Sequence, residues 1–185
     1  MHTYTNITIS GKIASGTTTL AKNVREILQW KYVNAGFIQR EWDRQHNHNE
    51  NAQGASSRPD EHEREVDAMT KKMLASEQHI IYEAWLAGFM AQGIDKVLKV
   101  LLYCSQDSIR IDRVVNRENI TIDEAKHRIK QREEENIAKW KKLYGDYEFW
   151  DTKYYDLIID TYASGPMETA GIVLDKLGYK VTVQA

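Results

Sequence analysis

Residues 7–21, ITISGKIASGTTTLA, join a short apolar run, a loop bounded by two glycines and a hydroxyl-rich segment. Gly11 and Gly16 occupy the two glycine positions of the phosphate-binding pattern G-x-x-x-x-G-K-[ST], and Thr18 occupies its last position. In such loops, backbone N–H groups and the N-terminus of a helix face the phosphates of a bound nucleotide. The stretch therefore predicts a strand, a phosphate-binding loop and a helix in that order.

One position departs from this pattern, because Thr17 stands where a lysine normally contacts the β- and γ-phosphates. Positive charge must then come from elsewhere, and later arginines are better candidates than Lys12, whose position normally points outward. The hydroxyl of Thr18 is the expected ligand of Mg²⁺. The residues expected to bind ATP are Gly11, Ala14, Ser15, Gly16, Thr17, Thr18 and Thr19. A glycine-rich turn without a ligand is the alternative interpretation.

The bulk composition restricts the class of protein. A chain of 185 residues with 42% hydrophobic and 28% charged residues is expected to form one globular domain spanning residues 1–185. A net charge of −2 gives no indication of binding to nucleic acid or an anionic membrane. Cys104 is the only cysteine, which excludes an intramolecular disulfide. Because the chain has neither a signal-peptide pattern nor an apolar run of ~20 residues, a cytoplasmic location is expected. A monomer or homodimer is expected.

Short apolar runs alternate with longer helical patterns, which predicts a parallel sheet with helices on its faces. Strands are expected near residues 7–9, 32–33, 79–82, 99–103 and 157–159, with a short final strand near 178–183. Helices are expected near residues 17–30, 37–45, 60–76, 106–117, 121–143 and 166–177. A capping box at Thr121 and Glu124 and a first-turn proline at Pro166 support the last two helices.

Residues 46–57 interrupt this alternation with a polar, aperiodic segment that predicts a mobile loop. His46 and His48 lie within it, but no third cysteine or histidine is near enough in sequence to complete a metal site. A solvated loop is the expected interpretation.

Several motifs resemble those of archaeal-type cytidylate kinases, whose phosphate loop reads G-x-x-G-S-G-T-T with threonine in place of lysine. Residues 34–40, NAGFIQR, are similar to the family's S-A-G-x-x-[FY]-R, and residues 155–161, YDLIIDT, to its Y-D-L-x-[IL]-[DN]-T. Residues 79–83, HIIYE, are similar to a strand that ends in an acidic residue. Residues 113–118 and 128–133 resemble an arginine-bearing lid, which Tyr144 and Gly145 follow.

This resemblance is collinear over nearly the whole chain. It implies a three-layer α/β/α P-loop kinase fold with a five-stranded parallel sheet. It further implies a helical acceptor-binding segment at about residues 36–76 and a helical lid at about residues 113–140. The implied activity is Mg²⁺-dependent phosphoryl transfer from ATP to a nucleoside monophosphate, most simply CMP or dCMP.

The resemblance also implies roles for individual side chains. Gly36, Arg40 and Asp67 match positions at the acceptor site, and Trp85 is placed to stack on an acceptor base or to pack in the core. Catalytic roles are expected for Arg128, Arg132 and Glu83.

Each residue expected to be catalytic also has a structural alternative. Two arginine pairs are spaced i,i+4 and so share a helix face: Arg113 with Arg117, and Arg128 with Arg132. These arginines either neutralise phosphates or form surface ion pairs with neighbouring glutamates. Glu83 ends an apolar strand, where it either holds a Mg²⁺-bound water or caps the following helix.

Two departures from the family leave the acceptor open. The family reads [DE]-G-R after its third strand, whereas this chain reads Glu83-Ala84-Trp85 and lacks an arginine that contributes to binding the acceptor phosphate. Lys139 stands where a lid-helix arginine is expected, and lysine lacks the bidentate geometry of arginine. The alternatives are therefore a P-loop kinase with another small-molecule acceptor, and a catalytically dead nucleotide-binding module.

Overall fold

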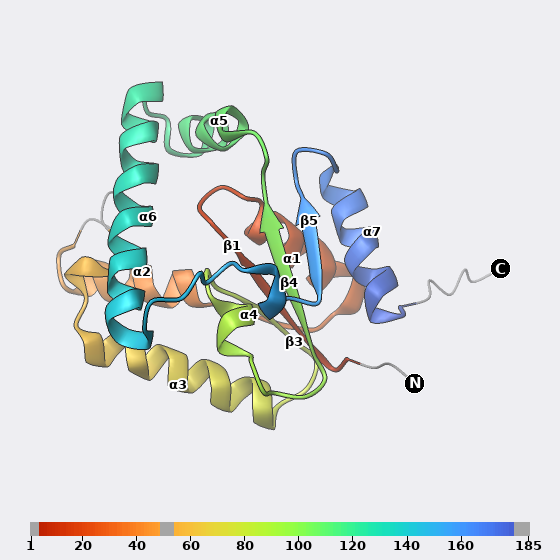
Figure 1. The fold of residues 1–185 in the computed structure, drawn as a ribbon. Coiled ribbons are helices and arrows are strands. Elements are labelled where there is room, and N and C mark those ends of the chain that lie inside the picture. Colours follow the sequence, from red (N-terminus) through yellow and green to blue (C-terminus); the bar gives the residue numbers. More distant parts are fainter. Residues whose placement is uncertain (1–3, 49–53, 180–185) are drawn as a thin grey trace.

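The computed structural model describes residues 4–48 and 54–179, and its centre is a parallel five-stranded sheet (Figure 1). The strand order is β2-β3-β1-β4-β5. The strands are β1 (Asn6–Gly11), β2 (Lys31–Asn34), β3 (Ile80–Glu83), β4 (Val97–Tyr103) and β5 (Leu157–Asp160). In the register of the sheet, Ile9 lies opposite Glu83 and Gly11 opposite Leu102. The phosphate loop and the end of β3 therefore meet at the same edge of the sheet.

Helices cover both faces of the sheet and extend beyond its carboxyl edge (Figure 1). One face is covered by α1 (Thr17–Leu28) and α7 (Pro166–Leu177), and the other by α2 (Ala35–Gln45), α3 (Asp60–Ser76) and α4 (Ala87–Met90). Beyond the edge lie α5 (Asp107–Glu118) and α6 (Ile122–Tyr144). Two short 3₁₀ turns, η1 (Ala55–Ser57) and η2 (Thr152–Tyr154), complete the fold.

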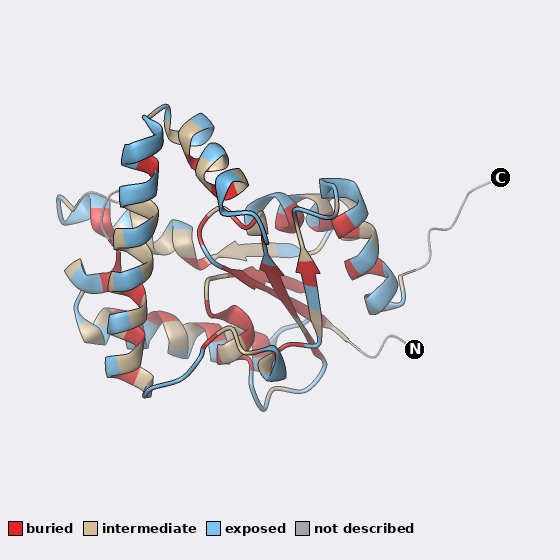
Figure 2. Cartoon of the chain, turned by 45° about the horizontal axis from the view of Figure 1, so that its top comes forward, coloured by how far each residue is buried: buried red, intermediate tan, exposed pale blue. Residues whose placement is uncertain are grey.

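The apolar core lies on both faces of the central strands. Ile7, Ile9, Leu98 and Val100 are fully buried, as expected for parallel strands covered on both faces. Figure 2 shows the buried residues concentrated in these strands and on the helix surfaces that face them. This packing fixes the carboxyl edge of the sheet as a rigid platform for the loops that follow it.

The expected three-layer fold and all five predicted strands are confirmed. The boundaries differ in detail: α1 ends at Leu28 rather than at residue 30, because Gln29 adopts a left-handed conformation with φ 56°. The capping oxygen of Thr121 accepts a hydrogen bond from the backbone N–H of Glu124 at 3.3 Å, and Pro166 opens α7, both as predicted. The predicted final strand lies largely outside the described residues, since only Gly178 and Tyr179 of it are described.

The structure also contains features that the sequence patterns did not predict. The short helix α4 follows β3 directly, and its four residues are too few to show a helical period. Part of the predicted loop at 46–57 is ordered by tertiary contacts, since Ala55 in η1 is fully buried. Within the described ranges, none of the helices combines the length and apolar character that crossing a membrane requires.

Candidate active site

The phosphate loop connects β1 to α1, and backbone geometry explains its glycines. A Cβ atom on Gly11 would lie 2.6 Å from the carbonyl oxygen of Leu102, so any larger residue would collide with β4. Gly16 has φ +98°, a conformation that L-residues rarely adopt. Ala14 also has a positive φ of 60°, at a position where the resembling kinases carry glycine. The loop thus holds the shape expected of a phosphate site.

Side chains from α5 and from the end of β5 hold the carbonyl groups of this loop. Arg110 donates to the carbonyl of Ile13 at 3.1 Å, and Arg113 donates to that of Ala14 at 2.9 Å. The hydroxyl of Thr161 donates to the carbonyl of Ser15 at 2.9 Å. In a trans peptide the C=O and the following N–H point in opposite directions. With the carbonyls fixed on one side, the N–H groups of Ala14 and Gly16 face the other side.

Glu83 is the centre of a buried hydrogen-bond network. One of its carboxylate oxygens accepts hydrogen bonds from Thr17 at 2.8 Å and from Thr18 at 2.6 Å. The other accepts from Asn34 at 2.6 Å and from the phenol of Tyr32. Burial and the Glu83 carboxylate raise the pKa of the Tyr32 phenol, which therefore remains a donor. Glu83 does not cap α4, which begins at Ala87 without a side-chain cap, so the helix-capping alternative is wrong.

The donors around Glu83 fit a magnesium site. The hydroxyl of Thr18 donates a hydrogen bond to Glu83, so the lone pairs of the Thr18 hydroxyl oxygen remain available to a cation. Mg²⁺ prefers oxygen ligands and is usually held by one or two protein groups together with substrate phosphates. The described ranges contain no cluster of three or more histidine, cysteine, aspartate or glutamate side chains that could hold a metal by itself.

A cavity of about 870 Å³ opens beside the phosphate loop, and we call it the loop cavity. It is lined by residues of the loop and α1, of the β5–α7 connection and by cations of α2, α5 and α6. The cations are Arg40, Arg113, Arg117, Arg128 and Arg132. The two predicted i,i+4 arginine pairs thus face the phosphate loop, as a lid would.

The cations of the loop cavity differ in how far their charge is already neutralised. Arg128 pairs with Glu118 at 3.0 Å and with Glu124 at 2.5 Å, and Arg117 pairs with Glu118 at 2.6 Å. Arg40 and Arg132, in contrast, make no hydrogen bond or ion pair with any residue in 4–48 or 54–179. These two are therefore the cations best able to take up a bound anion.

Arg132 lies among other positive charges. Burial, followed by the proximity of Arg117, Arg40 and Arg58, lowers the pKa of Arg132 to about 10. A partly buried, unpaired guanidinium among like charges is costly unless an anion joins it. The position of Arg132 therefore favours a phosphate ligand.

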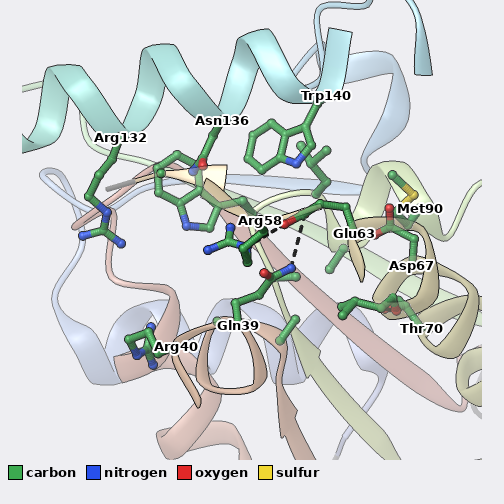
Figure 3. Close-up of a pocket in the computed structure, with 18 of the residues that line it drawn as sticks. Gln39, Arg40, Arg58, Glu63, Asp67, Thr70, Met90, Arg132, Asn136 and Trp140 are labelled. Atoms are coloured by element: carbon green, nitrogen blue, oxygen red, sulfur yellow. Dashed lines mark hydrogen bonds and ion pairs between the residues drawn. The ribbon is translucent and has the colours of Figure 1, made fainter. Parts of the chain in front are cut away.

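A second, smaller cavity of about 100 Å³ lies between α2, α3, α4 and α6, and we call it the helix cavity (Figure 3). Its polar lining consists of Gln39, Arg40, Asp43, Arg58, Glu63, Asp67, Thr70, Arg132 and Asn136. Gly36 and Trp85 line it as well, so all four predicted acceptor-binding residues are brought together here. Arg40 and Arg132 line both cavities, which places them where the two meet.

Arg58 is a residue of this cavity that the sequence analysis missed. Its guanidinium donates to Glu63 at 2.6 Å and to Asp43 at 2.9 Å, and its side chain is only 10% exposed (Figure 3). Arg58 follows the polar segment directly and shares no helical spacing with other site residues, so no local pattern indicated it. Arg58 brings a guanidinium group to this cavity. The family's arginine after β3, in whose place this chain has Trp85, is absent from it.

Trp85 occupies the position of that missing arginine. Its ring packs against Trp140 and Trp150, with ring centroids 5.7 and 6.3 Å away, and its carbonyl accepts a hydrogen bond from Trp150. It lines the helix cavity and belongs to the apolar cluster beneath α6. Both predicted possibilities, core packing and contact with an acceptor, are therefore compatible with its position.

Asp67 lies in the wall of the helix cavity without a hydrogen-bond partner among the described residues. Burial and, next, the neighbouring Glu63 raise the pKa of Asp67 to about 7. A carboxyl group with this pKa changes its charge near neutral pH. Perturbed carboxyl groups of this kind are typical of binding and catalytic sites.

Helix α6 is bound to the segment before α3. Glu135 accepts hydrogen bonds from the backbone N–H of Gly54 and the hydroxyl of Ser56, both at 2.6 Å, and Asn136 accepts from the N–H of Ala55 at 2.6 Å. Lys139 pairs with Asp60 at 2.5 Å, so this departure from the family's arginine holds α6 to α3. The prediction of a mobile loop is therefore wrong for residues 54–57.

The two histidines of that segment contact an aromatic ring. Both His46 and His48 stack on Trp42, with ring centroids 3.8 and 5.6 Å from it. Residues 49–53 of the predicted loop lie outside the described residues.

A phosphate loop and an arginine-lined cavity on a parallel α/β sheet, with a second cavity that shares two of the arginines, define a P-loop kinase. The sequence places the protein within this class. Residues 6–163 match the Cytidylate kinase-like family, so the chain belongs to that family.

Curated relatives agree with this assignment. The chain is 36% identical over 179 residues to the cytidylate kinase of Pyrococcus abyssi, covering 95% of this chain and 96% of the relative. It is also 36% identical over 177 residues to the cytidylate kinase of Methanopyrus kandleri, covering 90% of each.

Solved structures show the same fold at low sequence identity. A gluconokinase from Sinorhizobium meliloti superposes with a TM-score of 0.62 at 13% identity, covering 96% of this chain and 94% of that one. A shikimate kinase from Acinetobacter baumannii superposes with a TM-score of 0.58 at 13% identity, covering 98% and 97%. At this identity, they support the fold alone.

Proposed function

We propose that this protein transfers the γ-phosphoryl group of ATP to CMP or dCMP. The observation that carries this proposal is the position of Arg40 and Arg132, which line both the loop cavity and the helix cavity. Phosphoryl transfer requires two anionic substrates to meet in line, and shared unpaired cations at the junction serve that purpose. The names of the curated relatives favour a cytidine nucleotide as the acceptor.

In the proposed reaction, ATP lies in the loop cavity. The N–H groups of the phosphate loop bind its phosphates, while Arg110, Arg113 and Thr161 keep the loop carbonyls turned away. When bound, Mg²⁺ would neutralise phosphate charge, and Thr18 and Glu83 are the residues that would hold it directly or through water. Thr17 donates to Glu83 and so positions its carboxylate, which is one role for the residue in place of the usual lysine.

The acceptor lies in the helix cavity, and about residues 36–76 form most of its site. Arg40 binds the acceptor phosphate, and Arg132 of the lid, about residues 113–140, neutralises charge on the group in transfer. Arg58 reaches this cavity from a different segment, but Asp43 and Glu63 already neutralise its charge. Arg40 and Arg132 are therefore the two arginines that serve the acceptor phosphate without the arginine that Trp85 replaces.

The proposal is tested by measuring ADP formation from ATP and Mg²⁺ with CMP, dCMP, UMP, AMP, GMP, dTMP and unphosphorylated nucleosides. We expect the highest kcat/KM with CMP or dCMP. Removing the unpaired cation in Arg132→Ala should lower kcat with CMP by at least about 100-fold, since arginines that act on the transferred group contribute about 10³–10⁵-fold.

The matched control is Lys130→Ala on the same helix. Lys130 is exposed and, in the described part of the chain, pairs only with Glu134 at 3.9 Å, so this variant should retain wild-type kcat. Turnover with a different acceptor alone would contradict the choice of CMP. ATP binding without transfer to any acceptor would contradict the kinase activity itself.

A further inference from the structure

The lining of the helix cavity is chemically divided. At one end, Arg40 and Arg132 offer unpaired positive charge toward the loop cavity. Elsewhere in its wall, Gln39, Asp43 and Asp67 carry oxygen atoms without hydrogen-bond donors in the described ranges. A ligand that satisfies both must carry an anionic group at one end and N–H donors at the other.

Gln39 is the most informative of these residues, because the orientation of its amide group is fixed. Its Nε2 donates to the carboxylate of Glu63 at 3.3 Å (Figure 3). One oxygen of Glu63 accepts from Arg58 at 2.6 Å and the other accepts from Gln39, so the amide nitrogen of Gln39 faces this carboxylate. The carbonyl oxygen of Gln39 is therefore turned away from Glu63, and it is buried without a donor among the described residues.

A second hydrogen-bond acceptor lies on the same face of α2. Asp43 follows Gln39 by four residues, lines the same cavity and keeps one buried carboxylate oxygen without a donor, while the other accepts from Arg58. A buried acceptor without a donor costs roughly 1–3 kcal/mol. This wall therefore favours a group with N–H bonds and disfavours a carbonyl oxygen.

We propose that the carbonyl oxygen of Gln39 binds the exocyclic amino group of a pyrimidine nucleotide, and that this contact makes the enzyme select cytosine over uracil. The inference rests on the proposed function and adds to it the residue that determines base specificity. Cytosine presents an amino group where uracil and thymine present a carbonyl oxygen. Because Glu63 holds the amide, Gln39 cannot turn to offer its N–H₂ group to uracil.

The size of the cavity acts in the same direction. Adenine also carries an amino group, but it has two rings. The helix cavity is small, about 100 Å³, so it favours a one-ring base over a two-ring base. A single-ring base that carries an amino group suits both the size of this cavity and the hydrogen-bond acceptors in its wall.

The test combines a change in the protein with a change in the substrate. We compare wild type and Gln39→Leu with CMP, UMP and the monophosphate of the 2-pyrimidinone riboside, which lacks a substituent at the amino position. For wild type, kcat/KM should fall at least tenfold from CMP to each analogue, mainly through KM. In Gln39→Leu, the ratio of kcat/KM for CMP to that for UMP should fall at least tenfold, and CMP should lose its advantage over the 2-pyrimidinone.

Two controls make the result specific. Gln45→Leu changes an exposed glutamine at the end of the same helix and should leave every ratio unchanged. Glu63→Gln removes the charge that fixes the amide and should raise kcat/KM for UMP relative to CMP, because Gln39 can then turn. Because glutamine is nearly isosteric with glutamate, Glu63→Gln still tests the proposal if Gln39→Leu folds poorly.

The outcomes separate the two proposals. If wild type phosphorylates CMP but Gln39→Leu and Glu63→Gln keep the wild-type ratio of CMP to UMP, the assignment of Gln39 is wrong and the kinase activity stands. If wild type phosphorylates neither CMP nor dCMP, the proposed function is wrong.

Discussion

At the scale of single residues, the site is built from groups in unfavourable environments. Within residues 4–48 and 54–179, Arg132 lies unpaired among other arginines, and Gln39 keeps a buried carbonyl without a donor. Asp67 has its pKa raised to about 7 by burial and by Glu63. Each of these arrangements lowers the stability of the free protein and is relieved by a ligand of complementary chemistry.

For Asp67, this cost can be measured through its pH dependence. An aspartate has an ordinary pKa of 3.8, so in the unfolded chain it ionises far below pH 7, whereas in the folded protein it ionises near pH 7. The unfolded state is therefore favoured progressively as pH rises from about 4 to 7. Asp67→Asn should raise the free energy of unfolding at pH 8.5 by about 2–4 kcal/mol and change it little near pH 4.

Urea unfolding of both proteins at the two pH values measures this difference. Glu61→Gln, an exposed position on the same helix, serves as the control and should show no pH-dependent gain. An equal gain for Asp67→Asn at both pH values would show that the carboxyl group is not perturbed.

At the scale of elements, the contact between α6 and η1 closes the helix cavity. Asn136 is 6% exposed and is the acceptor for the N–H of Ala55, which is fully buried. Glu135 and Lys139 add contacts to Gly54, Ser56 and Asp60 on the same side of α6. Helix α6 and the segment before α3 are thus joined by specific polar contacts.

Breaking this contact should loosen the cavity. Asn136→Leu leaves a buried N–H without an acceptor, so we expect a loss of about 1–3 kcal/mol in the free energy of unfolding and a severalfold higher KM for CMP. Glu134→Ala changes a neighbouring exposed position that, among the described residues, pairs only with Lys130, and it should lose less than about 0.5 kcal/mol. Urea denaturation and steady-state kinetics measure both effects. Equal behaviour of the two variants would contradict the role given to Asn136.

At the scale of the whole molecule, the net charge of −2 conceals a strongly uneven distribution. Arginines of α2, α5 and α6 line the loop cavity, and those of α2 and α6 also line the helix cavity. α2 follows β2, whereas α5 follows β4 and leads into α6, so residues far apart in sequence come together because β2 and β4 end at the same edge of the sheet. The fold therefore creates one continuous anion-binding surface that runs through both cavities.

A single ligand that spans both cavities should consequently bind more tightly than either substrate. We expect adenosine and cytidine joined through a pentaphosphate to bind at least about 100-fold more tightly than ATP, as bisubstrate analogues gain from intramolecular linkage. Calorimetric titration measures the affinities, and Arg132→Ala should remove most of the gain. The corresponding diadenosine compound is the control and should bind more weakly than the mixed one. An affinity no greater than that of ATP would show that the two cavities do not form one continuous surface.

The sequence by itself determined the features that depend on neighbouring residues. Apolar runs predicted the strands, Gly11 and Gly16 predicted the phosphate loop, and the hydroxyl of Thr121 predicted the start of α6. Collinear motifs indicated the family, and they placed Arg40 and Asp67 in one acceptor site. These properties follow from local backbone geometry and from side-chain periodicity, both of which can be predicted from neighbouring residues in the sequence.

Only the tertiary structure decided which groups are paired and which are free. Arg128 and Arg132 are equivalent in spacing, yet glutamates from α5 and α6 neutralise the first and none neutralises the second within the described ranges. Arg58 reaches the helix cavity, and Glu63 fixes the amide of Gln39, through contacts between α2, α3 and the segment before α3. Hydrogen bonding and desolvation depend on positions in space. Residues far apart in sequence therefore set the charge, orientation and availability of each group in the site.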